Sequence, residues 1–231
     1  MKRFWKTAEA VAAGDGWAVQ LDFAPLRTPG GALLDVPTKP LAEAIAGEWA
    51  AAGDTFDQGA MPLTGIANVA IDRVASDRTA FAADIGKYAQ TDLACYRAEG
   101  PATLVARQGE SWDALLAWAR RRYDVDFVTT AGIVPVAQPR ATVDRLAHAV
   151  AELDAFRLAG LAPLVTIGGS LAAALAVVEG AYTAEQAWEA VSIDERWQLE
   201  KWGADGEAEA ALANRQQQFL AGARFLALLG A

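Results

Sequence analysis

The chain has 231 residues, and its 29 acidic and 20 basic residues give a formal net charge of −9. It contains a single cysteine, Cys95, and a single histidine, His148. One cysteine cannot form an internal disulfide, and one histidine cannot supply a multi-histidine or histidine–cysteine metal site. The acidic balance argues against a protein that binds nucleic-acid phosphates, which needs clustered Lys and Arg. We therefore expect no metal, no cofactor and no nucleic-acid partner.

Strand and turn signals dominate the first 60 residues. The segment from Trp17 to Phe23 alternates apolar and polar residues, which predicts a half-buried strand, and residues 4–11 can supply its hairpin partner. Thr38, followed by Pro40, predicts the start of a helix with Thr38 as its N-cap. These signals predict a small mixed α/β domain over residues 1–60, built mainly of antiparallel strands.

From about Met61 onward the apolar spacing is helical. Helices are predicted over residues 63–74, from Ser111, over 141–158, over 171–178 and from about 206 to 229. Capping boxes at Thr183 and Ser192 predict two helix starts and a break near Ser192. The predicted fold is therefore α+β, with the small N-terminal domain followed by a larger all-helical domain over residues 61–231.

The sequence also bears on location. The uncharged stretch from Leu158 to Val178 is long enough to span a bilayer. It contains Pro163 and the pair Gly168–Gly169, which favours buried helices over a membrane span. The N-terminal residues show neither the apolar region of a secretory signal nor the pattern of a transit peptide. We expect a bacterial cytoplasmic protein, or a mitochondrial matrix protein if the source is eukaryotic.

Three features that could carry chemistry favour structural roles. Cys95 lacks a second cysteine at redox spacing and is expected to be a buried thiol. His148 lies opposite the apolar stripe of its helix and is expected to face solvent. The turn from Gly168 to Ser170 could bind an anion or permit close helix packing. Paired carboxylates alone can catalyse glycoside hydrolysis, so a carboxylate-based enzyme stays open.

Residues 179–209 concentrate both acid and tryptophan. This segment holds nine acidic and two basic residues, and three of the eight tryptophans, which are Trp188, Trp197 and Trp202. Glu195, Gln198 and Trp202 share one helix face, at i, i+3 and i+7. An acidic surface with tryptophan suits a partner with basic and apolar surface. The alternative is that the tryptophans lie in the core and the acids form a solvated face.

Blocks that follow one another along almost the whole chain resemble a known family. They are Gly16–Asp22, Leu26–Pro29, Val36–Thr38, Leu41–Trp49, Met61–Thr64, Thr91–Leu93, Cys95–Arg97, Trp112–Asp113, Gly132–Ile133, Gln138–Pro139 and Gly169–Ser170. The set resembles the assembly chaperones of the F(1) sector of ATP synthase, specifically the member that acts on the alpha subunit. The family's C-terminal signature is similar to the block that contains Asp194, Glu195, Gln198, Trp202, Gly203 and Asp205. The chain departs from the family at Leu21–Pro25, where Gly-Arg is more usual in the turn, and at Ala94.

The resemblance implies a non-enzymatic chaperone that binds the free alpha subunit and prevents its aggregation until beta joins it. It places partner binding in the C-terminal signature. The candidate residues are Glu195, Asp194, Gln198, Trp202 and Asp205, with the neighbouring acid Glu207. We expect the free protein to be monomeric and without stable membrane insertion. The alternatives are the carboxylate-based enzyme and a generic helical adaptor for another protein.

Overall fold

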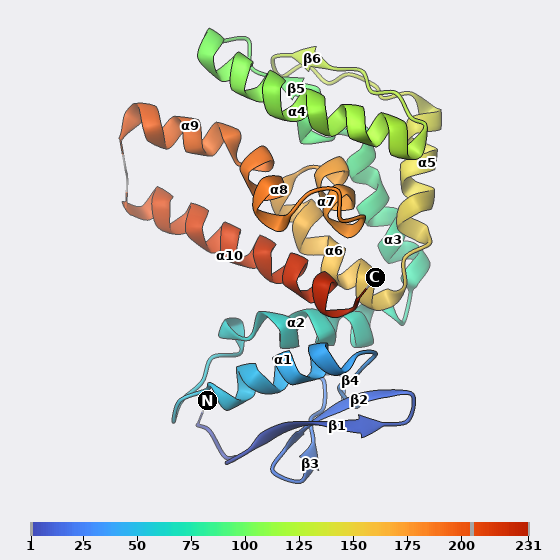
Figure 1. Cartoon of the computed structure of the whole chain (residues 1–231), viewed down its shortest axis with the longest axis vertical. Coiled ribbons are helices and arrows are strands. Elements are labelled where there is room, and N and C mark those ends of the chain that lie inside the picture. The colour runs from blue at the N-terminus through green and yellow to red at the C-terminus, as the bar shows by residue number, and fades with distance from the viewer. Residues whose placement is uncertain (1, 204–205, 231) are drawn as a thin grey trace. The chain divides into compact units, whose positions relative to one another are not determined.

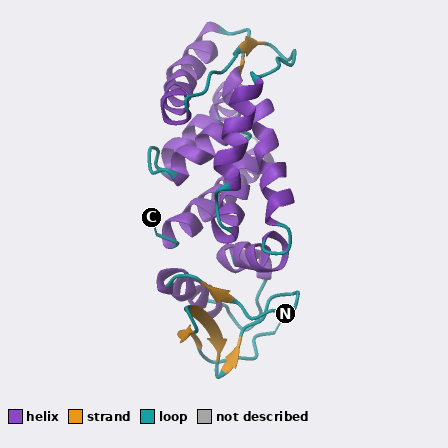
Figure 2. Ribbon diagram, turned by 90° about the vertical axis from the view of Figure 1, so that its right-hand side faces the viewer, coloured by secondary structure: helices purple, strands orange, loops and turns teal. Residues whose placement is uncertain are grey.

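The computed structural model describes residues 2–203 and 206–230, and it forms two compact units. The first unit contains Met1–Arg78, Asp154–Gly160 and Arg224–Ala231, and the second contains Thr79–Leu153 and Leu161–Ala223. The predicted α+β class is confirmed, because the larger sheet lies in the first unit and the second unit is mainly helical (Figure 2). The bounds of the predicted domains, 1–60 and 61–231, differ from those of the two units. The domain division stays a prediction about which segments fold independently.

A small antiparallel sheet forms one side of the first unit. Its strands are β1 (Ala8–Ala13), β2 (Gly16–Leu21), β3 (Ala24–Pro25) and β4 (Asp35–Val36), and the other three all pair with β2. Alternation along β2 directs Val19 and Leu21 into the core. The predicted strand is therefore present, and its hairpin partner is residues 8–13 rather than 4–11.

Helix α1 (Lys39–Ala50) packs on this sheet (Figure 1). It begins as predicted, because the Thr38 hydroxyl oxygen accepts a hydrogen bond from the Leu41 N–H. Its buried face joins Trp5, Trp49 and Phe56 in one aromatic and aliphatic core. The next segment comprises η1 (Gln58–Ala60), α2 (Pro62–Val69) and the π-helical turn η2 (Ala70–Val74). The helix predicted over residues 63–74 is thus present, with its last turn widened.

The second unit is built mainly of helices. Its elements are α3 (Arg78–Gly86), η3 (Lys87–Gln90), η4 (Leu93–Cys95), β5 (Tyr96–Arg97), α4 (Ala102–Tyr123), β6 (Thr130–Ala131), α5 (Arg140–Ala151), most of α6 (Ala155–Gly168), α7 (Leu171–Val178), α8 (Ala184–Val191), α9 (Ile193–Trp202) and most of α10 (Gly206–Leu228). The short parallel pair of β5 and β6 is a departure from the all-helical expectation.

The uncharged stretch from Leu158 to Val178 is buried in the protein. It forms α6 and α7, which are separated at Gly169, where a φ of +68° suits glycine. Every residue from Leu171 to Ala176 is buried, and the four alanines among them allow α7 to pack closely against α4 and α8. In the described part of the chain, no helix is both long and apolar enough to cross a bilayer.

Two predicted helix bounds were wrong. The helix expected to start at Ser111 begins at Ala102, where Pro101 precedes it and no side chain caps it. The helix expected over residues 141–158 is divided into α5 and α6. Asp154 accepts a hydrogen bond from the Arg157 N–H at 2.8 Å, and this local bond favours a new helix start over continuation.

Cys95 is fully buried, as expected. Burial, reinforced by the nearby Asp92 carboxylate, raises the pKa of its thiol to about 12. Because the thiolate is the reactive form, we expect thiol reagents at pH 8 to leave the folded protein unmodified and to label the chain in urea. Mass spectrometry before and after denaturation measures this. Rapid labelling of the folded protein would contradict the burial of this thiol.

Candidate partner-binding surface

Helix α9 and the first part of α10 lie largely in solvent. Trp197 is the one buried side chain among those described in α9, and α10 buries nothing before Phe219. Helices in proteins gain most of their stability from packing an apolar face. We call residues 193–203 and 206–218 the α9–α10 surface; both helices are labelled in Figure 1. Its exposure leaves room for a partner.

The acids of this region do not form one continuous patch. Glu179 forms a bidentate ion pair with Arg122, and Glu200 forms an ion pair with Arg107 at 2.7 Å. Trp188 and Trp197 are buried, which bears out the alternative that these tryptophans belong to the core. The α9–α10 surface is therefore charged with both signs rather than lined with aromatic anchors in its described part.

Asp194 joins α9 to α4. Its Oδ1 accepts a hydrogen bond of 2.7 Å from Nε2 of Gln108, a buried residue of α4. The Gln108 Oε1 in turn accepts one from the Ala98 N–H. Burial raises the pKa of the Asp194 carboxyl, the Gln108 hydrogen bond opposes that rise, and the Glu195 charge adds to it. Asp194 thus has an internal partner that fixes the first turn of α9.

Glu195 joins α9 to α10. Its Oε1 accepts a hydrogen bond of 2.7 Å from Arg215, which also donates to the backbone carbonyl of Ile167 at 2.9 Å. The Glu195 side chain is 36% exposed and that of Arg215 is 43% exposed. The pair therefore holds the two helices at the surface, where both groups also reach solvent.

The remaining predicted site residues divide into two groups. Gln198 and Glu207 are exposed, on α9 and on the first turn of α10. The side chain of Trp202 and the whole of Asp205 lie outside the described part of the structure. The structure thus brings Asp194, Glu195 and Gln198 together on α9.

Gln108 and Arg215 were missed by the sequence-based prediction. Gln108 lies four residues before Trp112 on the buried stripe of α4, and a polar residue there is a signal for a buried hydrogen-bond partner. Arg215 offers no such signal, because its pairing with Glu195 spans two helices.

A groove of about 620 Å³ runs beside α9, between α4 and α8, and includes Arg107, Glu110, Gln186, Glu189, Arg196 and Glu200.

The turn from Gly168 to Ser170 is already occupied by the chain's own groups. The Ser170 hydroxyl accepts a hydrogen bond from the Ala173 N–H and caps α7. The buried Asp92 carboxylate accepts one from the Ala172 N–H at 2.9 Å. The internal carboxyl group of Asp92 therefore takes the place that an external anion would need. No group of three or more His, Cys, Asp or Glu suited to a metal occurs among the described residues.

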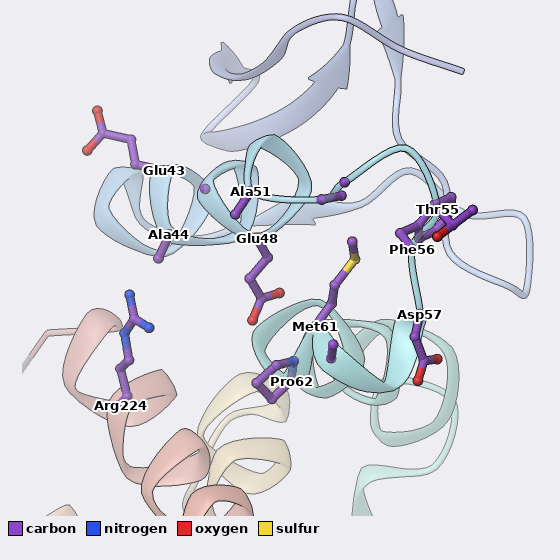
Figure 3. Close-up of a pocket in the computed structure, with 14 residues that line it drawn as sticks. Glu43, Ala44, Glu48, Ala51, Thr55, Phe56, Asp57, Met61, Pro62 and Arg224 are labelled. Carbon is purple, nitrogen blue, oxygen red and sulfur yellow. The ribbon is translucent and has the colours of Figure 1, made fainter. Parts of the chain in front are cut away.

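A second groove, of about 770 Å³, lies in the first unit beside α1 (Figure 3). It is lined by three carboxylates, Glu43, Glu48 and Asp57, as the alternative of a carboxylate-based enzyme would need. Glu48 instead accepts hydrogen bonds from the N–H groups of Leu63 and Thr64, at 2.7 and 2.8 Å. This carboxylate caps α2 and is engaged in holding the unit together.

Replacing Asp194 by Asn tests the cost of ionising this half-buried carboxyl group. Because the folded-state pKa lies above that of the unfolded chain, ionisation of Asp194 costs stability as the pH rises through the folded pKa. Asn keeps the acceptor oxygen for Gln108. We therefore expect the variant to be at least as stable as wild type at pH 7, with the difference vanishing below about pH 4. Urea unfolding at several pH values measures this difference. A variant whose free energy of unfolding falls relative to wild type as the pH rises would contradict the prediction.

On this α+β scaffold, the exposed and charged α9–α10 surface can attract a partner protein of complementary charge. The family model described as "ATP12 chaperone protein" matches residues 2–120. The chain belongs to this family of ATP synthase assembly chaperones, the family that its sequence blocks resemble. The matched residues end before the α9–α10 surface.

Whole-chain comparisons extend the likeness to the C-terminal helices. The crystal structure of Atp12 from Paracoccus denitrificans is 44% identical, with a TM-score of 0.92 over 99% of this chain and 98% of that one. The crystal structure of the Atu1473 protein from Agrobacterium tumefaciens is 36% identical, with a TM-score of 0.93 over 99% of this chain and 86% of that one. The mitochondrial protein atp12 of Schizosaccharomyces pombe is 24% identical over 87% of this chain and 74% of its own length.

Proposed function

We propose that this protein binds the free alpha subunit of the F(1) sector and keeps it from aggregating until it pairs with beta. We further propose that it does so without catalysing a reaction. The observation that carries the proposal is the exposed α9–α10 surface in a member of the ATP12 chaperone family. The carboxylates of Asp194 and Glu195 are engaged by Gln108 and Arg215, which supports binding and positioning roles over acid–base chemistry.

A holding role places physical demands on such a surface. A subunit that has not yet assembled exposes apolar area destined for its neighbours, and large exposed apolar patches aggregate. A chaperone that covers this area must later be displaced, so moderate affinity suits it better than an obligate interface. Charged residues on exposed helices provide steering and salt-sensitive contacts of this kind.

The direct test mixes the purified protein with isolated alpha subunit, isolated beta subunit and assembled F(1). We expect a one-to-one complex with alpha by size-exclusion chromatography, and none with beta or with the assembled sector. An equimolar amount should also suppress alpha aggregation on dilution from urea, and its affinity should fall as salt rises from 50 to 500 mM. Absence of an alpha complex, or equal binding to beta, would overturn the proposal.

A further inference from the structure

An apolar loop projects from the second unit between β6 and α5. Its residues Ile133 and Val134 are 95% and 70% exposed, and Val128 before it is 41% exposed. No charged residue occurs between Asp126 and Arg140, in a chain in which charged residues make up 21%. Single exposed apolar residues are ordinary, whereas adjacent ones at the tip of an uncharged loop form a small apolar patch that a partner can cover.

The base of this loop is fixed by hydrogen bonds. The Gly132 N–H donates to the carbonyl of Arg97 at 2.9 Å, and the φ of Gly132 is +82°, which suits glycine. The buried Gln138 side chain donates to the Val128 carbonyl at 2.8 Å and accepts from the Val128 N–H at 3.0 Å. Ile133 and Val134 are therefore held out by a defined base, which lowers the entropy cost of docking.

The same hydrogen-bond network reaches the α9–α10 surface. The backbone carbonyl of Arg97 accepts the hydrogen bond from Gly132. The guanidinium group of Arg97 donates to the backbone carbonyl of Gln108 at 2.9 Å. The Gln108 amide then donates to Asp194 at 2.7 Å. The Gln108 side chain also accepts a hydrogen bond from the Ala98 N–H, which follows β5. Gln108 thus links the strand that supports the loop to the first turn of α9, through its backbone carbonyl and its side chain.

We propose that the loop tip, Ile133 to Val136, is a second docking element that contacts the apolar assembly surface of the unassembled alpha subunit. This inference rests on the proposed function and adds an apolar contact to the charged one. The lack of charge over residues 127–139 favours an apolar partner surface over a charged one, and a subunit that has not yet assembled exposes apolar area of this kind. The tip is only a few residues long, so the contact releases when the subunit's natural neighbour competes for the same surface.

The test replaces both tip residues by serine, Ile133→Ser with Val134→Ser. Since both side chains are exposed, the circular dichroism spectrum and the melting temperature should not change. We expect the dissociation constant for isolated alpha to rise at least tenfold and aggregation suppression to weaken accordingly. The matched control is Phe23→Ser, which removes an apolar side chain that is 96% exposed in the first unit. Equal weakening by the control would show unspecific adhesion and overturn the assignment of the loop.

A second measurement locates the contact. Because Cys95 is buried, Ile133→Cys and Phe23→Cys can each carry one environment-sensitive fluorophore. Adding alpha should shift the emission of the label at position 133 to the blue and leave the label at position 23 unchanged. A shift at position 133 on raising the protein's own concentration, without alpha, would make the loop a self-association surface and overturn the inference.

The two proposals fail separately. If the unaltered protein forms no complex with alpha, the proposed function fails and the loop loses its partner. If the unaltered protein binds alpha but the double serine variant binds within twofold of it, the loop inference alone fails. The charged α9–α10 surface would then account for recognition.

Discussion

Replacing Asp92 by alanine is expected to lower the free energy of unfolding by about 3 kcal/mol. This residue is fully buried, and its two carboxylate oxygens accept hydrogen bonds from the N–H groups of Ala94 and Ala172, at 3.0 and 2.9 Å. Alanine would leave both donors buried without an acceptor, at about 1–3 kcal/mol each, and would remove a cap from α7. Urea unfolding followed by circular dichroism measures the loss.

Two further variants separate capping from general damage. Asp92→Asn keeps one acceptor oxygen but sets an amide against another donor, so it should lose less stability than alanine does. Asp84→Ala removes an exposed acid that pairs with Lys87, and such surface pairs contribute at most about 1 kcal/mol. If Asp92→Ala unfolds at the same urea concentration as Asp84→Ala, Asp92 does not anchor the N-terminus of α7.

Reversing the charge of Glu195 is expected to weaken binding of the isolated alpha subunit about tenfold or more while leaving the fold intact. Glu195→Lys breaks an ion pair that is partly exposed, so the stability change should be small. Like charges placed across an interface are far more costly. Titration calorimetry with alpha measures the affinity, and circular dichroism checks the fold.

The pairing with Arg215 provides a sharper control. Exchanging the two residues, Glu195→Arg with Arg215→Glu, restores the ion pair but inverts its direction. A partner contact made by Glu195 predicts that the exchange variant still binds weakly, whereas a role limited to the ion pair predicts recovery of binding. Because the exchange also removes the Arg215 bond to the Ile167 carbonyl, Arg215→Lys serves as the control for loss of that bond alone. Asp144→Lys, at an exposed helix acid that pairs with Arg140, should leave binding unchanged.

Short-range chemistry made much of the fold predictable. Thr183 and Gln186 form the predicted capping box, because both hydrogen bonds lie within one helical turn. Ser192 shows where such reasoning fails. Its hydroxyl donates to the Trp188 carbonyl four residues earlier instead of capping α9, so the helix break is where it was predicted but the capping box is absent. An alternative local partner, invisible in the spacing, decided the outcome.

The candidate site was less predictable, because its geometry depends on distant partners. Asp194 and Glu195 stand out in the sequence as acids in a conspicuous block. Their partners Gln108 and Arg215 come from other helices, and only the packing of α4 and α10 brings them into reach. In the sequence, Gly132–Ile133 is one of the blocks that resemble the family. The exposure of this loop depends on hydrogen bonds made by Gln138 and Gly132, which no periodicity in the sequence predicts.

The discontinuous core of the first unit has a consequence for how the protein is made. Trp5 and Val19 share a core with Phe225 and Leu229, and the Thr38 hydroxyl donates to the carbonyl of Leu228 at 2.6 Å. On the ribosome, the strands and α1 emerge long before the end of α10 exists. The apolar faces of the strands and α1 stay partly uncovered until Phe225 and Leu229 have been translated. A chaperone of this design completes its own first unit only after residues 225–229 have been synthesised, and until then its uncovered apolar surface is open to aggregation, as that of an unassembled subunit is.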